Sequence, residues 1–450
     1  MLSLDELSTW FAAVPDYQQF LSLEELNESS RTLAEEFPDW VKLETIGHSS
    51  EHRPIHLLTV GKGSRSALFI GAPHPNEPIG TLTLDFMARH LCEDRELANR
   101  YDCQFHFINV ADPDGLKLNE GWLRSPFTPL SYALNYYSPP HAAQVEWGFP
   151  IRYKTLEFLD APDETRAVMS VMNRYRPRFL YSLHNGIFCG VYFYLSRRSA
   201  PLFEALHTMV SELGMTLDRG EPDGPWIKPW ARAIYPVFGA REMYDYMEET
   251  FGPNPPRLIG GGTSSDDFLS TIVPERTSIV TELPYFTEPA LADDGPSGTT
   301  RREAIGTAIG NVATALQMIK SNLVQLRPRL SDCRLLRAVE DYLLRMPANL
   351  EGQRSALVSD AFSREATRAE LADMTFSGIF QPTLQLGMLR RLADSVGDEE
   401  RTAQIEAHLR EQINAIESNY RLHIFPIRQL VSVQLGAGLL ALTECFKALE

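Results

Sequence analysis

The segment ALFIGAPHPNEP, residues 67–78, carries the strongest structural signal in the chain. Its first four residues are a short apolar run of the kind that forms a buried strand. Pro78 suits the first turn of a helix, and apolar residues recur at helical spacing from Thr81 to Leu91. His74 and Glu77 therefore fall on a strand-to-helix turn. In open α/β sheets, ligands bind at this end of the strands.

A second histidine occupies the same kind of position, because His184 ends the apolar run FLYSL at residues 179–183. Strands of one sheet would bring His74, Glu77 and His184 to one edge. Two imidazoles and one carboxylate leave one zinc position open, which is typical of catalytic zinc sites. The sequence therefore predicts one Zn²⁺ per chain on these three side chains. A His-x-x-Glu pair is also common outside metal sites, so the residues alone leave both interpretations open.

Strand-like apolar runs alternate with helical patterns from Ile55 to about Phe286. We expect strands at residues 55–60, 67–72, 104–110, 179–185, 190–196 and 278–284. A helix is expected from Asp163 to Tyr175, ended by the Arg-Pro pair that follows. Alternation of this kind predicts a layered α/β domain.

The pattern changes after about Leu326, where only helical spacing remains. Apolar residues recur in this way at Leu336, Val339, Leu343 and Met346. Thr367 and Glu370 match a capping box at the start of another helix. We expect an α/β domain with a helical N-terminal lead-in over residues 1–326 and an all-helical extension over residues 327–450. The extension carries no catalytic pattern, and we expect it to pack on the domain, cover the cleft or form a homo-oligomer interface.

The composition bounds the function. The 450 residues carry a net charge of −17, which disfavours nonspecific attraction to nucleic acid or anionic membranes. The N-terminus lacks the pattern of a secretory signal, and the most apolar run, residues 430–442, is shorter than the ~20 residues of a membrane span. The five scattered cysteines suit a reducing compartment. We expect a cytoplasmic protein that binds neither nucleic acid nor membranes.

Six short segments extend the pattern in chain order. They are TIGHSSEHRPI (45–55), HPNE (74–77), DPDG (112–115), LHN (183–185), GGTSSDDF (261–268) and TEL (281–283). Together they resemble motifs of the M14 (carboxypeptidase A-like) zinc carboxypeptidases. The resemblance covers roughly residues 40 to 320. It implies a mixed sheet flanked by helices, zinc on the three predicted ligands, and hydrolysis of peptide or peptide-like amide bonds.

The resemblance also implies roles for further residues. Glu282, near the end of an apolar strand, would be the general base that takes a proton from water and passes it to the leaving amine. Arg124 stands where the family places an arginine that stabilises the oxyanion. Asp266 falls where the family reads the substrate side chain, and a carboxylate there suits Lys or Arg. The alternative is that Asp266 or Asp267 caps a helix starting at Phe268.

The segments also depart from the family pattern. Asn76 replaces an arginine that many members carry between the first two ligands, and we expect Asn76 and Asn185 to contact substrate. The family's Asn-Arg pair for the substrate's terminal carboxylate should lie between Arg124 and the third ligand. No such pair occurs there, and Arg152 and Arg166 are poor candidates. The carboxylate-binding residue is therefore not identified by the sequence.

This departure leaves three hypotheses for the function. The first is a cytoplasmic zinc metallopeptidase, most simply a carboxypeptidase. The second is a zinc-dependent N-acyl amino acid deacylase, like the aspartoacylase and desuccinylase group, which also uses His-x-x-Glu followed by His. The third is a non-catalytic binding protein on the same scaffold. The specificity-loop segment 261–268 and the chain length favour the peptidase over the deacylase.

Overall fold

One mixed sheet of nine strands forms the centre of the molecule. The computed structural model describes residues 2–124, 126–220, 222–253 and 259–447. The strands are β1 (Val41–His48), β2 (Pro54–Val60), β3 (Arg65–Ile70), β4 (Cys103–Ile108), β7 (Phe179–Phe188), β8 (Tyr192–Leu195), β9 (Ile234–Pro236), β10 (Thr277–Thr287) and β13 (His423–Ile424). Their order is β1-β2-β4-β3-β7-β10-β8-β9, and β13 pairs with β10. Strands β4, β3, β7 and β10 run parallel, so their carboxyl ends meet at one edge.

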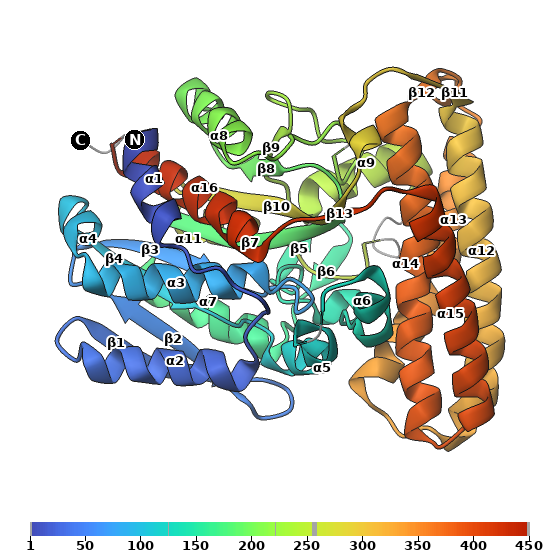
Figure 1. Cartoon of the computed structure of the whole chain (residues 1–450), viewed down its shortest axis with the longest axis horizontal. Coiled ribbons are helices and arrows are strands. Elements are labelled where there is room, and N and C mark those ends of the chain that lie inside the picture. The colour runs from blue at the N-terminus through green and yellow to red at the C-terminus, as the bar shows by residue number, and fades with distance from the viewer. Residues whose placement is uncertain (1, 125, 221, 254–258, 448–450) are drawn as a thin grey trace.

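Helices cover both faces of this sheet (Figure 1). They are α1 (Leu4–Ala13), α2 (Leu23–Glu36), α3 (Ile79–Glu93), α4 (Glu96–Arg100), α5 (Pro113–Leu123), α6 (Pro129–Asn135), α7 (Asp163–Tyr175), α8 (Ala200–Glu212), α9 (Ala240–Phe251), α11 (Ser265–Ile272) and α16 (Ile427–Lys447). The central strands are buried on both sides: Phe69 packs into one core with α3 and α16, whereas Leu68 and Ile70 pack into a second core with α7. This explains why the strands read as unbroken apolar runs.

The predicted elements of the α/β part are present. Each of the six expected strands forms with ends shifted by a few residues, and the expected helix 163–175 is α7. Arg176 ends α7 in a left-handed conformation with φ +46°, just before Pro177. The sequence analysis missed β1, which lies beyond α2 in the supposed helical lead-in. It pairs with β2 at the sheet edge, with an irregularity between Thr45 and Gly47.

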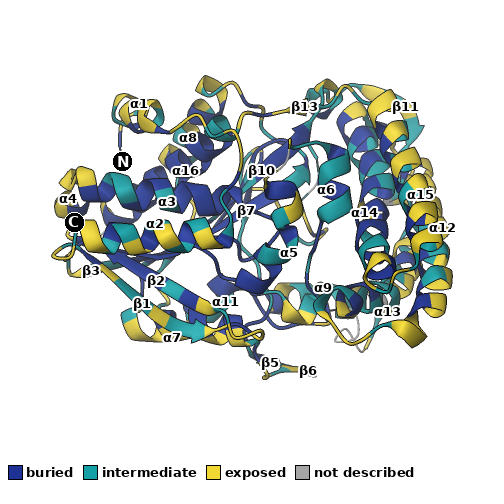
Figure 2. Ribbon diagram, turned by 60° about the horizontal axis from the view of Figure 1, so that its bottom comes forward, coloured by how far each residue is buried: buried dark blue, intermediate teal, exposed yellow. Residues whose placement is uncertain are grey.

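Four long helices form a separate layer at one end of the sheet (Figures 1 and 2). They are α12 (Arg301–Leu326), α13 (Arg334–Ala356), α14 (Arg368–Ser395) and α15 (Glu399–Asn419). Short elements complete the described chain: β5 (Ile151–Tyr153) with β6 (Leu156–Phe158), β11 (Pro296–Thr300) with β12 (Glu365–Thr367), and the 3₁₀ turns η1 (His141–Ala143), η2 (Pro289–Ala292), η3 (Arg327–Arg329) and η4 (Asp360–Phe362). Thr367 and Glu370 form the expected capping box of α14.

The helical layer does not coincide with the expected extension 327–450, because it begins and ends earlier in the chain. It begins with α12 at Arg301, and after α15 the chain returns to the sheet, where β13 pairs with β10 and α16 packs on α3, α8 and β10. We call residues 301–419 the helical layer and the rest the α/β part. The reason lies in α16, which is apolar on all sides and therefore needs cover on all sides. Only the sheet and its helices provide that cover.

By length and composition α16 is also the one helix in the described ranges that qualifies as a membrane span. In the structure 89% of its most apolar window is buried inside the protein. Figure 2 shows α16 as buried over most of its length. The helix is thus a core element of the protein.

Candidate functional site

His74, Glu77 and His184 come from two adjacent parallel strands. His74 and Glu77 lie on the turn between β3 and α3, and His184 lies on β7, the neighbour of β3 in the sheet. The start of α3 approaches β7 closely, because a Cβ on Gly80 would come within 2.7 Å of the Leu183 Cβ. Glycine at this position therefore allows the turn to sit directly beside the third side chain.

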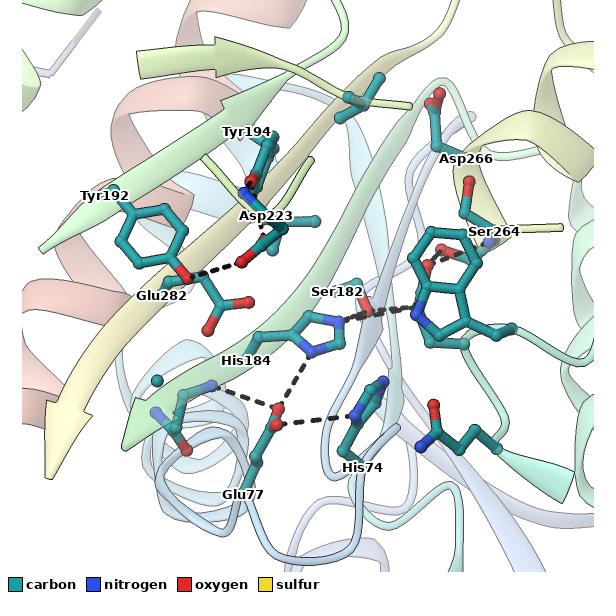
Figure 3. Close-up of a pocket in the computed structure, with 18 of the residues that line it drawn as sticks. His74, Glu77, Ser182, His184, Tyr192, Tyr194, Asp223, Ser264, Asp266 and Glu282 are labelled. Carbon is teal, nitrogen blue, oxygen red and sulfur yellow. Dashed lines mark hydrogen bonds and ion pairs between the residues drawn. The ribbon is translucent and has the colours of Figure 1, made fainter. Parts of the chain in front are cut away.

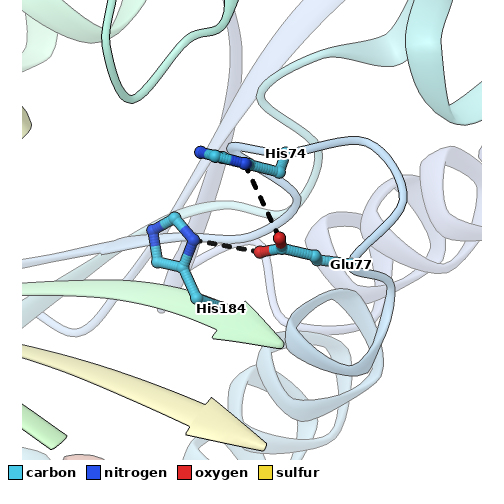
Figure 4. A group of neighbouring side chains, drawn as sticks. All are labelled: His74, Glu77 and His184. Carbon is cyan, nitrogen blue, oxygen red and sulfur yellow. Dashed lines mark hydrogen bonds and ion pairs between the residues drawn. The ribbon is translucent and has the colours of Figure 1, made fainter. Parts of the chain in front are cut away.

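The three side chains converge as the sequence predicted (Figures 3 and 4). Their potential ligand atoms all lie within 4.8 Å of one another. His184 Nδ1 is 2.9 Å from Glu77 Oε2, and His74 Nδ1 is 3.6 Å from Glu77 Oε1. The imidazole rings are 4.9 Å apart and nearly perpendicular. Two imidazole nitrogens and a carboxylate at this spacing form a donor set that suits a metal ion such as zinc.

The other ring nitrogen of His184, Nε2, contacts Ser182 and Glu146 on the side away from Glu77. His184 Nε2 lies 2.9 Å from the Ser182 hydroxyl and 3.7 Å from Glu146 Oε2. Glu146 also accepts hydrogen bonds from the Ser182 hydroxyl and from the backbone and hydroxyl of Ser265. Such an acceptor fixes the tautomer and the orientation of a metal-binding histidine. Burial alone would lower the pKa of His184, but the Glu77 and Glu146 carboxylates raise it well above its usual value.

The α16 helix supports the same residue from the other side. Gln434, fully buried within the apolar run of α16, donates to the His184 carbonyl at 2.9 Å and accepts from the Thr83 hydroxyl at 3.1 Å. The sequence analysis did not single out Gln434. A lone amide within an otherwise apolar run was the available signal, since a buried amide needs partners.

Glu282 lies directly beside His184. The parallel register of β7 and β10 pairs the two residues, and Figure 3 shows both side chains on the same side of the sheet. Burial raises the pKa of Glu282 well above its usual value, and the carboxylates of Glu77 and Asp223 add to this shift, whereas His184 opposes it. Its raised pKa makes the Glu282 carboxylate a stronger proton acceptor than an exposed carboxylate.

A cavity of about 430 Å³ contains the site. It is lined by His74, Glu77, His184 and Glu282, and the predicted substrate contacts Asn76 and Asn185 line it too. Its lining in the described chain includes no lysine and no arginine. A volume in this range is typical of a small-molecule or peptide-end site. The α/β part therefore presents acids, imidazoles and amides to a ligand, but no cation.

The two asparagines are positioned by one tyrosine. The buried Tyr285 hydroxyl donates to the Asn76 carbonyl at 2.9 Å and lies 3.2 Å from Asn185 Oδ1. The Asn185 backbone N–H donates to Glu77 Oε2 at 3.2 Å. Asn185 Nδ2 is buried and has no partner among the described residues. The free amide N–H is thus available to a ligand oxygen.

Arg124 is not part of this site. It ends α5 as an exposed residue, and its guanidinium pairs with Glu25 of α2. It does not line the cavity. The reason is that α5 runs away from the strand edge from its N-cap at Asp112, so its C-terminal end faces α2 instead of the metal-type ligands. The structure therefore does not bring Arg124 to the cavity, where the sequence analysis expected it.

Asp266 reaches the cavity wall with its charge already paired. Its two carboxylate oxygens accept from the Arg276 guanidinium, with Nε at 2.8 Å. Both side chains of this pair are largely buried. A substrate cation at Asp266 would therefore have to displace Arg276. The alternative expectation of an Asp cap is wrong, because the α11 helix starts earlier, with Ser264 as its N-cap. Arg152 and Arg166 pair with exposed acids elsewhere.

Tyr192, Tyr194 and Asp223 are among the lining residues that the sequence analysis did not single out (Figure 3). The Tyr194 hydroxyl donates to Asp223 at 2.7 Å, and the Tyr192 hydroxyl lies 3.4 Å from the same carboxylate. Burial raises the pKa of Asp223. Tyr192 and Tyr194 alternate on β8, which is a period-two signal for one face of a strand. Asp223 lies in an irregular segment before β9 and has no sequence signal of its own.

Comparisons with known proteins agree with the sequence motifs in the N-terminal part. The family model described as zinc carboxypeptidase (Peptidase_M14) matches residues 26–126, which include His74 and Glu77 but not His184 or Glu282. No curated protein matches this sequence at a significant level.

Several solved structures are partly similar to this chain. Carboxypeptidase A from Helicoverpa armigera has 14% sequence identity and a TM-score of 0.40, over 63% of this chain and 71% of its own. Bovine thrombin-activatable fibrinolysis inhibitor, in complex with tick carboxypeptidase inhibitor, has 15% identity and a TM-score of 0.37, over 58% and 86%. A metallo-carboxypeptidase from Burkholderia cenocepacia has 15% identity and a TM-score of 0.34, over 59% and 60%.

Proposed function

We propose that the protein is a zinc-dependent hydrolase of peptide or peptide-like amide bonds, in line with the match of residues 26–126 to the zinc carboxypeptidase (M14) family model. The observation that carries the proposal is the convergence of His74, Glu77 and His184 beside Glu282 in one cavity. Within this class a metallocarboxypeptidase agrees best with the family match. The free state of all five cysteines supports a reducing, cytoplasmic environment.

His74, Glu77 and His184 would hold the ion. Their donor atoms match the ligand types of catalytic zinc, and Glu146 fixes the orientation of His184 in the way such ligands require. Zinc, when bound, polarises the substrate carbonyl and lowers the pKa of a water molecule. Three protein ligands leave room for these partners.

Glu282 acts as the general base in this proposal. Its burial favours the protonated form, so its carboxylate is a stronger proton acceptor than an exposed one. The proton taken from water is then passed to the nitrogen of the leaving amine. The register beside His184 keeps the carboxylate next to the reacting carbonyl throughout.

Asn185 takes the role that the sequence analysis gave to Arg124. Its Nδ2 is buried without a partner in the described chain, and Tyr285 holds its other side-chain atom. A positioned N–H donor of this kind stabilises the negative charge that develops on a carbonyl oxygen. Asn76 lines the same wall and is fixed by the same tyrosine.

The experiment that tests the proposal uses the full-length protein with measured zinc content. We expect about one zinc per chain and hydrolysis of an unblocked peptide. Glu282→Gln should keep the zinc and lose about 10²- to 10⁴-fold in turnover, the usual contribution of general acid–base catalysis. The matched control is Glu275→Gln, at an exposed position before the same strand, which should keep full turnover.

Three outcomes would contradict parts of the proposal. Near-normal turnover of Glu282→Gln would remove this residue from the mechanism. Faster cleavage of N-acyl amino acids than of any peptide would favour a deacylase. Substoichiometric zinc after gentle purification, together with no hydrolysis of either substrate, would favour a binding protein.

A further inference from the structure

A second cavity, of about 170 Å³, lies between the α/β part and the helical layer. We call it the seam cavity. Tyr136, Ser138 and Gln144 line it from the α/β part, and residues of α13 and α14 line it from the helical layer. The same three residues also line the cavity that holds the metal-type ligands. The two cavities therefore share a wall.

The seam cavity collects polar atoms without partners. Tyr342 Oη, Arg345 Nη1 and Gln385 Oε1 are all buried, and none has a hydrogen-bond partner among the described residues. Buried polar groups are nearly always paired, and each exception asks for an explanation. Three exceptions from two helices facing one cavity point to a ligand that supplies the missing partners.

Arg345 gives the seam cavity its charge. Its side chain is 24% exposed, and its nearest acid, Asp341, is 4.0 Å away. Asp341 is in turn engaged by the His141 backbone N–H at 3.2 Å. An arginine stays charged in proteins, so a guanidinium that is largely buried and so weakly paired favours an anion.

The three free atoms match the end of a peptide. The guanidinium fork of Arg345 suits a carboxylate, and the Tyr342 hydroxyl can donate to the same group. Gln385 Oε1 can accept a hydrogen bond from an amide N–H. A carboxylate with an adjacent N–H is what the terminal residue of a peptide presents.

We propose that the seam cavity binds the terminal carboxylate of the substrate, with Arg345 of the helical layer as the residue that pairs with it. This inference rests on the proposed function. It supplies the cation that the cavity lining of the α/β part lacks. It also identifies the carboxylate-binding residue that the sequence between Arg124 and His184 does not contain. The helical layer would then determine the preference of the protein for substrates with a free C-terminal carboxylate.

The test compares a peptide with a free C-terminus and the same peptide with a C-terminal amide, using zinc-loaded full-length protein. Wild type should prefer the free carboxylate. Arg345→Met should lose about 10- to 100-fold in kcat/KM on the free peptide, the value of a lost charged hydrogen-bond pair, and change little on the amide. Tyr342→Phe removes one hydroxyl without a large change of shape and should show a smaller loss in the same direction. If Arg345→Met does not fold, Tyr342→Phe still tests whether the seam cavity binds the carboxylate.

The matched control is Arg337→Met on the same helix, where the arginine is exposed and pairs with Asp332. It should leave both peptides unchanged. Equal losses on both peptides in Arg345→Met would mean a structural role and would overturn the inference. So would a wild type that does not distinguish the two peptides.

A binding measurement separates this inference from the proposed function. Calorimetry of the metal-free protein with N-acetyl-alanine and with N-acetyl-alaninamide requires no catalysis. Binding of the acid only, abolished by Arg345→Met, would support the carboxylate site even if no substrate were cleaved. Absence of binding to wild type, with peptide hydrolysis intact, would overturn the inference and leave the proposed function standing.

Discussion

The α/β part and the helical layer handle buried charge in opposite ways. In the α/β part, carboxylates such as Glu77, Glu146 and Glu282 gather around the main cavity, and its lining in the described chain has no arginine. The helical layer instead presents arginines to the boundary, Arg334 and Arg345 among them. The comparison shows that the buried acids of the α/β part and the arginines of the helical layer depend on each other for charge pairing at the boundary.

Arg334 shows this most directly. It is the first residue of α13, and its side chain is only 13% exposed. Its guanidinium lies 2.6 Å from Asp114, 2.9 Å from Glu164 and 3.3 Å from Asp112, and the side chains of all three acids are almost fully buried. Arg53 shares Asp114. The helical layer is thus fastened to the turn that follows β4.

The largest effect should follow from breaking this fastening. Arg334→Met would leave buried carboxylates without their shared cation, and removal of one partner of a buried ion pair costs about 3–5 kcal/mol. We expect the free energy of unfolding in urea to fall by that amount. Arg337→Met, which breaks an exposed pair one turn along, should cost only about 0–1 kcal/mol. Similar small losses in both variants would show that the boundary does not depend on this charge.

The sequence predicted the part of the molecule that local pattern controls. Apolar runs located the strands around His74 and His184, because buried parallel strands need unbroken apolar sequence. The ligands followed from their positions at strand ends, which the parallel register then brought together. Once a strand has been located from its apolar run, the residues at its carboxyl end follow directly from the local sequence.

The same pattern could not predict contacts that join distant segments. Arg334 and Asp114 are 220 positions apart, and no spacing rule connects them. The pairing of Asp266 with Arg276 was missed for a similar reason, since Arg276 lies beyond the end of α11. Arg124 was placed by motif order alone, without knowledge of the direction of α5. Charge pairing across elements is fixed by tertiary packing.

The second prediction concerns the loss of folding stability at acidic pH, which we expect to depend on a buried histidine in the α/β part. His106 on β4 is fully buried, with its Nδ1 2.9 Å from the Thr59 hydroxyl and its ring 3.9 Å from that of Tyr175. Burial lowers the pKa of His106 from 6.5 to about 4. Between pH 6.5 and about pH 4, His106 is protonated in the unfolded chain but neutral in the folded chain. The free energy of unfolding therefore falls as the pH falls.

The expected loss from His106 between about pH 6.5 and pH 4 is about 3 kcal/mol at most, because its pKa falls from 6.5 to about 4 on folding. Asp112 works in the opposite direction, because burial raises its pKa to about 6 and its protonation favours the folded state. The measurement is therefore the difference between wild type and His106→Gln in urea unfolding at several pH values. The curves should converge as the pH falls. Parallel curves would show that His106 does not titrate in this range.

The smallest effect tests how closely the two parts are packed. A Cβ on Gly387 of α14 would lie 1.8 Å from the Ala133 carbonyl oxygen of α6, so the helical layer touches the α/β part backbone to backbone here. Gly387→Ala should cost about 1–3 kcal/mol through overpacking, despite the better helix propensity of alanine. Gly306→Ala on α12, where a Cβ meets nothing within 4 Å, should instead gain about 0.5–1 kcal/mol.

These two substitutions make the same chemical change in two helices of one layer, so helix propensity cancels between them. Their difference measures only the contact of α14 with α6. Opposite signs would mean that α14 is held rigidly enough for Gln385 to keep its place at the seam cavity. Equal gains in both variants would mean that α14 can move away from α6, and a carboxylate site shared between the two parts would then lack the fixed geometry that recognition of a chain end requires.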